Sequence, residues 1–161
     1  MNPETLEFDS ADELLELIRQ INIKYYMPLT SNICFLEECG NRIYFVYLIA
    51  LKDAYSHLNR VFDYDIQTPH GKENARRHLI LYSDHLQEGL MDTFRKIVEL
   101  QWNSVKKNIP EKELSAIEVQ VALKTSQLRI VSNSITIDQR IDGYRSLLDY
   151  LENIQKKFSL P

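Results

Sequence analysis

Histidine, arginine and aspartate side chains gather at two places in the middle of the sequence. Asp53, His57 and Arg60 are spaced by four and three residues, so on a helix they share one face. His78 and His85 are seven residues apart, which again places them on one helical face. Histidine exchanges protons near neutral pH and arginine stabilises phosphate charge, so this set of residues suits acid–base or hydrolytic chemistry on RNA.

The same residues have two other interpretations. Asp53, His57 and Arg60 have the spacing of ordinary side-chain pairs within a helix, and a structural role is favoured for each of them and for His78. Histidine and carboxylate ligands on facing helices also suit iron, manganese or zinc. Carboxylate-bridged di-metal bundles use paired Glu-x-x-His motifs, however, and the sequence contains none. We therefore expect no resident metal and no cofactor, and keep a metal-binding helical bundle as an alternative.

The two cysteines do not extend this set of candidate residues. Cys34 and Cys39 have no second Cys or His pair with the spacing of a zinc site, and a single bridge would hardly staple a chain of this size. We expect both to be small, semi-buried side chains in a reducing cytosol.

Composition predicts one all-α domain covering residues 1–161. Four glycines and five prolines are too few for the many turns of a sandwich or barrel, and 44% hydrophobic with 26% charged residues is typical of a folded globular chain. The formal net charge of −4 disfavours tight nonspecific binding to nucleic acid, so we expect no DNA partner.

We also expect a cytoplasmic protein without membrane association. The N-terminus has neither the basic segment nor the apolar segment of a signal peptide. The most apolar stretch, residues 43–51, is about half as long as a membrane span requires.

Apolar periodicity and breakers predict an antiparallel bundle of about five helices. Ser10 with Glu13, and Thr136 with Gln139, each have the spacing of a capping box at a helix start. Pro28 is expected to end the first helix and to begin an irregular segment, 28–40. The expected helices are 11–26, 41–64, 72–108, 111–133 and 137–158.

The two central helices, 41–64 and 72–108, are expected to form an antiparallel hairpin. The first half of 41–64 is apolar nearly all round, which is typical of a helix buried on several sides. A short turn joins the two helices, so residues equally far from the turn face each other. This places His57 near His78.

Two phrases in these helices resemble those of helical HEPN proteins, the higher eukaryote and prokaryote nucleotide-binding domains. Asp53-Ala54-Tyr55-Ser56-His57-Leu58-Asn59-Arg60 is similar to their Ala-x-x-His-Leu-x-Arg phrase, and residues 74–79 with 84–86 echo it. The resemblance covers about residues 45–100. It implies long antiparallel helices and frequent dimers, and many such proteins are RNases in toxin–antitoxin or antiphage systems.

The catalytic motif of that family is an arginine followed by a histidine after four to six residues, and this chain departs from it. Arg77 and His85 are separated by seven residues. The first hypothesis is therefore a noncatalytic HEPN-like domain that associates with a second copy, a protein partner, a nucleotide or RNA. The rival is a metal-independent RNase with the catalytic residues His57, Arg60, Arg77, His78 and His85.

Overall fold

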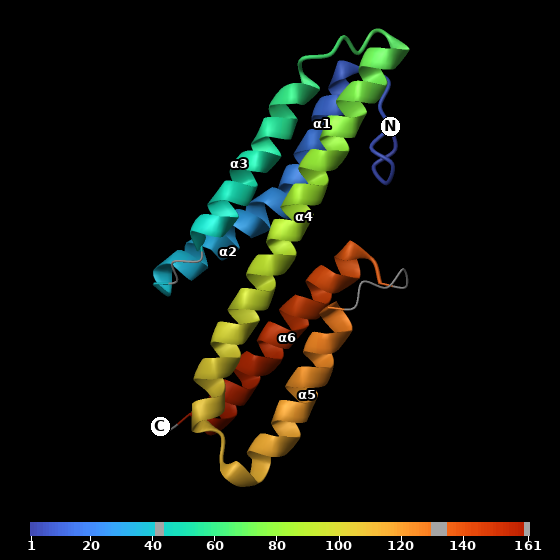
Figure 1. Ribbon diagram of the computed structural model, residues 1–161. Coiled ribbons are helices and arrows are strands. Elements are labelled where there is room, and N and C mark those ends of the chain that lie inside the picture. Colours follow the sequence, from blue (N-terminus) through green and yellow to red (C-terminus); the bar gives the residue numbers. More distant parts are fainter. Residues whose placement is uncertain (41–43, 130–134, 160–161) are drawn as a thin grey trace. The chain divides into compact units, whose positions relative to one another are not determined.

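The computed structural model describes residues 1–40, 44–129 and 135–159, and these residues form an all-α protein (Figure 1). The all-α prediction is confirmed. The chain divides into two compact units, Met1–Thr93 and Phe94–Pro161, and the helix α4 (Pro69–Val105) supplies residues to both. The prediction of a single domain stays a prediction.

The first unit begins with a helical segment that changes its winding twice. The helix α1 (Ala11–Ile21) is capped by Ser10, whose hydroxyl accepts a hydrogen bond from Glu13 N. A π-helical turn, η1 (Asn22–Tyr26), leads directly into α2 (Met27–Glu38). The prediction of an irregular segment over residues 28–40 is therefore wrong. Pro28 lies in the first turn of α2, where its missing N–H costs little, and the wide π-helical turn precedes it.

The helices α3 (Tyr44–Val61) and α4 form the expected hairpin, with residues 62–68 as the turn between them. Figure 1 shows α3 in teal beside the green first part of α4. α4 begins at Pro69, three residues earlier than predicted, because Pro69 again occupies a first-turn position. Residues 41–43 of the predicted helix 41–64 lie outside the described residues.

The core of the first unit comes from one face of each helix. α4 contributes fully buried Leu79, Tyr82, Leu86 and Leu90, and α2 contributes Leu29 and Leu36. A partly buried polar contact lies among them. Asn32 Nδ2 donates to Thr93 Oγ1 over 3.0 Å, while Thr93 Oγ1 donates to the Leu90 carbonyl over 2.9 Å.

The second unit pairs the helices α5 (Glu111–Arg129) and α6 (Ile137–Phe158) with the last part of α4 and a 3₁₀ turn, η2 (Lys106–Asn108). Thr136 and Gln139 form the expected capping box at the start of α6. The Phe94 and Tyr144 rings stack at 5.5 Å within this unit. Residues 130–133 of the predicted fourth helix lie outside the described residues.

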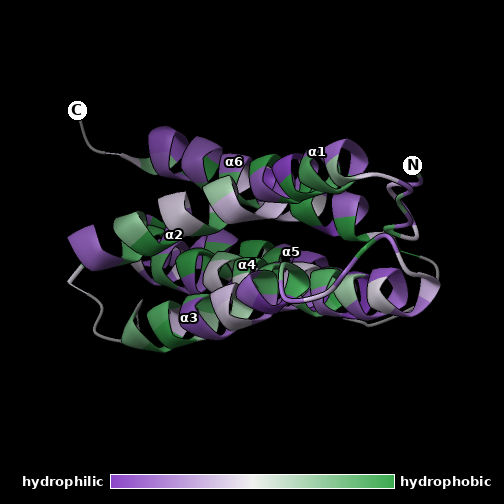
Figure 2. Cartoon of the chain, turned by 90° about the horizontal axis from the view of Figure 1, so that it is seen from above, coloured by the Kyte–Doolittle hydropathy of each residue, from purple (hydrophilic) through white to green (hydrophobic). Residues whose placement is uncertain are grey.

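The expectation that the first half of α3 is buried on several sides is wrong. Tyr47 and Ala54 on this helix are buried, but Phe45, Val46 and Ile49 are 55–61% exposed. Figure 2 shows this end of α3 in green, at the hydrophobic end of its scale. The apolar residues of α3 therefore divide between a core face and a face open to solvent.

Candidate functional site

The predicted meeting of His57 and His78 occurs at the hairpin of α3 and α4. Their Nδ1 atoms are 3.3 Å apart, so one ring donates a hydrogen bond and the other accepts it. On the other side of the His78 ring, Nε2 lies 3.3 Å from the hydroxyl of Tyr64, in the turn that follows α3. A chain of hydrogen bonds thus joins Tyr64, His78 and His57.

His85 completes a cluster of three imidazoles. Its ring stacks on that of His57 with centroids 5.1 Å apart and an angle of 13° between the planes. The rings of His57 and His78 stack at 5.6 Å, and those of Tyr64 and His78 at 5.7 Å. We call His57, His78, His85 and Tyr64 the imidazole cluster. Sequence spacing placed His57 by His78, but it did not identify Tyr64.

The surroundings of His57 disfavour positive charge on its ring. Partial burial is the largest of the causes that lower the pKa of His57. The neighbouring His85, His78 and Arg60 lower it further. Asp53, one turn earlier on α3, opposes this shift. His57 is therefore held as a neutral imidazole at neutral pH, the form that a general base requires.

The two predicted arginines differ in their relation to the cluster. Arg60 acts on His57 from one turn later on α3. The side chain of Arg77 is 70% exposed, and its Nε lies 3.9 Å from Glu73 Oε1 within α4. An arginine that stabilises phosphate beside these histidines would therefore be Arg60 rather than Arg77.

Within residues 1–40, 44–129 and 135–159, no three His, Cys, Asp or Glu side chains are arranged to hold a metal ion. The expectation that the two cysteines are semi-buried is wrong, because Cys34 and Cys39 are both exposed. Cys34 lies on the solvent side of α2, a helix that sequence reasoning missed.

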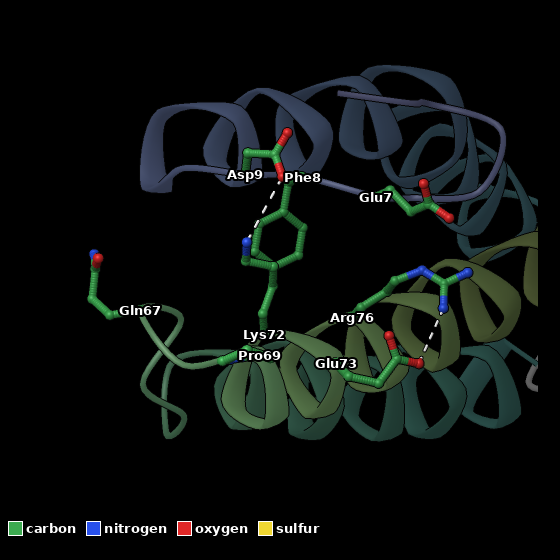
Figure 3. Close-up of a pocket in the computed structure, with 8 residues that line it drawn as sticks. All are labelled: Glu7, Phe8, Asp9, Gln67, Pro69, Lys72, Glu73 and Arg76. Carbon is green, nitrogen blue, oxygen red and sulfur yellow. Dashed lines mark hydrogen bonds and ion pairs between the residues drawn. The ribbon is translucent and has the colours of Figure 1, made fainter.

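A separate pocket of about 320 Å³ lies where the N-terminal segment meets the start of α4 (Figure 3). Lys72 Nζ is 3.7 Å from Asp9 Oδ1, and Arg76 Nη1 donates to Glu73 Oε1 over 3.2 Å. Arg76 Nε also donates to the Thr5 carbonyl. Because carboxylates face the same space as these cations, the pocket does not favour a phosphate ligand.

The feature that sequence reasoning missed is an apolar stripe on the exposed side of α3. Leu48, Tyr55 and Phe62 follow one another at intervals of seven residues and are 41%, 37% and 59% exposed. The Tyr55 ring also contacts those of Tyr26 and the buried Tyr82, with centroids 5.7 and 6.3 Å apart. Phe45 lies one turn before Leu48, Ile49 lies one turn after Phe45, and the two are 55% and 61% exposed. We call Phe45, Leu48, Ile49, Tyr55 and Phe62 the α3 stripe. The signal was present in the sequence, because a helix apolar nearly all round has more apolar faces than one core covers.

Comparison with known proteins gives no relative: no family model, no curated protein and no solved structure matches the chain. None of the described helices is both long enough and apolar enough to cross a membrane.

Proposed function

We propose that this protein is a noncatalytic, HEPN-like helical domain that acts by association, and that the α3 stripe is its contact surface. The observation that supports the proposal is five large apolar side chains between 37% and 61% exposed along one helix. Exposed apolar side chains gathered along one helix mark interaction sites in folded proteins. The stripe includes three aromatic side chains, the type enriched at protein interfaces.

A protein surface suits the stripe better than a nucleotide or RNA does. Binding to nucleic acid draws most of its free energy from cations that neutralise phosphates. None of the five residues of the stripe is charged, although the cation Lys52 interrupts the stripe. The whole chain has a net charge of −4, which disfavours a polyanionic ligand. Covering apolar side chains contributes instead through the hydrophobic effect, about 1 kcal/mol for each half-exposed residue.

A second copy of the chain is the proposed partner, because the stripe is complementary to itself. If two α3 helices cross antiparallel at their midpoints, Phe45 lies level with Phe62 of the other copy, and Lys52 lies level with its Tyr55. The first is an aromatic pair and the second a cation–π pair. A two-fold axis forms each contact twice, as in most homodimers.

The cellular setting belongs to the same proposal. The HEPN-like phrases around His57 and on α4 support a cytoplasmic protein of a bacterial defence or toxin–antitoxin system. The neighbouring genes test this setting: a toxin or nucleotidyltransferase gene beside it would support the proposal, and a setting of unrelated housekeeping genes would contradict it.

Disulfide trapping tests the proposed pairing. In a background with Cys34→Ser and Cys39→Ser, chains carrying Phe45→Cys are mixed with chains carrying Phe62→Cys. We expect the mixed disulfide to form faster than either disulfide between identical chains. Val119→Cys, on the exposed side of α5, is the control for random collision. Mixed trapping no faster than the Val119→Cys control would contradict the antiparallel pairing.

A second candidate function is a metal-independent RNase, and the meeting of His57, His78 and His85 favours it. A neutral His57 beside Arg60 provides a base and a cation for phosphate chemistry. An RNA-cleavage assay compares the wild type with His85→Ala and with the matched control His70→Ala, whose imidazole is exposed at the start of α4. Cleavage lost in His85→Ala and kept in His70→Ala would support the RNase; no cleavage by the wild type above His85→Ala would exclude it.

A further inference from the structure

The imidazole cluster links three segments of the first unit through a chain of hydrogen bonds. This chain of hydrogen bonds depends on how many protons the imidazole rings hold. Tyr64, in the turn, contacts His78 on α4, and His78 contacts His57 on α3. With both rings neutral, one Nδ1 carries a hydrogen and the other accepts it. Donors and acceptors can exchange roles along these hydrogen bonds, because the Tyr64 hydroxyl can either donate or accept.

One extra proton is compatible with this arrangement, and two are not. If His57 is protonated, its Nδ1–H donates to Nδ1 of His78, and Nε2–H of His78 donates to Tyr64. If both rings are protonated, two N–H groups and two positive charges face each other across 3.3 Å. The hydrogen bond is then lost and replaced by repulsion, which water screens less where the rings are partly buried.

The charged groups around the pair do not compensate a second proton. On α3, Asp53 favours protonation of His57 and Arg60 opposes it. On α4, His85 is a third titratable ring stacked on His57, and Asp84 interacts with both His85 and Glu88. The turn contributes the Tyr64 hydroxyl. His57 itself thus has one carboxylate, Asp53, against one guanidinium and two imidazoles.

We propose that His57 and His78 form an acid-sensitive latch between α3 and α4, closed while the pair holds at most one extra proton and opened when both rings are protonated. The latch goes beyond the proposed association, because it controls the hairpin within one chain. It requires no partner and no ligand.

The direction of the pH effect follows from linkage. The pKa of His57 is lower in the folded chain than the ordinary value of about 6.5. As the pH falls, the unfolded or opened chain binds the proton first, so stability is intact above about pH 6.5 and declines through that value toward the lower folded pKa. Each pKa unit by which the fold lowers the pKa of His57 corresponds to a tenfold change in the equilibrium constant for opening.

Hydrogen exchange tests the latch. Protection factors of the α3 amides, corrected for the intrinsic effect of pH, are compared at about pH 7.5 and pH 5.5, which lie on either side of the histidine range. In the wild type we expect protection to fall at the lower pH, by up to about tenfold for one histidine that the fold holds neutral. In His78→Gln, which cannot take up a proton at this position, α3 protection should fall less than in the wild type, because burial and His85 still oppose protonation of His57. His70→Gln should behave as the wild type, because His70 is exposed outside the cluster.

The wild type alone provides a second measurement if His78→Gln does not fold. Among the four histidine ring signals in an NMR titration, we expect that of His57 to titrate below about 6.5 and to shift together with loss of α3 protection. Equal loss of protection in wild type and His78→Gln would overturn the latch. Titration of His57 at or above the ordinary value would overturn it as well.

Discussion

The hydroxyl of Tyr82 donates a hydrogen bond to Oδ1 of Asn22 over 2.5 Å, which ties the middle of α4 to the π-helical turn between α1 and α2. Tyr82 is fully buried and Asn22 is half-buried. The contact fixes the place where the N-terminal helix changes its winding before Pro28. It therefore supports the local geometry that lets α2 follow α1 without a loop.

Tyr82→Phe should lower the free energy of unfolding by about 1 kcal/mol, because the half-buried amide oxygen of Asn22 loses its donor. Urea denaturation measures the change. In a double-mutant cycle with Asn22→Ala, the two losses should be less than additive, since both substitutions remove the same hydrogen bond. Strict additivity would show that the two side chains do not interact.

Tyr82 should also make the fold sensitive to alkali. Burial, and to a smaller extent Tyr26, raise the pKa of Tyr82 to about 12. The unfolded chain loses this proton first, near pH 10, so stability is intact below about pH 10 and declines as the pH rises toward 12. Tyrosinate absorbance during a pH titration should show a late-ionising group in the wild type that is missing from Tyr82→Phe. An unchanged titration curve would contradict burial of this hydroxyl.

Gly71→Ala should destabilise the turn between α3 and α4. A Cβ at this position would lie 1.9 Å from the carbonyl oxygen of Asp65, a backbone atom that cannot move aside. We expect a loss of about 1–3 kcal/mol, although alanine is otherwise the better helix former. Gly89→Ala is the matched control, because its Cβ would lie 3.3 Å from a methyl group of Leu29, which can shift. Thermal denaturation in which both variants lose equally would contradict this view of the turn.

The sequence predicted those parts of the fold that local signals determine. α6 begins at Ile137 and ends at Phe158 as expected, because Thr136 and Gln139 cap it within four residues of chain. The hairpin of α3 and α4 followed from a short turn, and with it the approach of His57 to His78. Pro28 was misread because the same residue ends one helix or starts another, and only the preceding π-helical turn distinguishes the two.

Features that depend on packing could not be predicted in this way. Periodicity identified α3 as apolar, but it did not show which apolar residues the core would cover. Tyr47 is 8% exposed and Ile49 is 61% exposed, although they are two residues apart. The place of Tyr64 in the imidazole cluster likewise depends on the path of the turn. The RNase and HEPN-like assignments remain predictions.

Light scattering tests the central claim, association through the α3 stripe, most directly. The molar mass is measured against concentration for the wild type, for Ile49→Lys on the stripe, and for Val119→Lys at a similarly exposed position on α5. We predict that the wild type and Val119→Lys rise from 19.0 kDa toward twice that mass, while Ile49→Lys stays at 19.0 kDa. A wild type that remains at 19.0 kDa at every concentration, or a dimer that Ile49→Lys leaves intact, would contradict the claim.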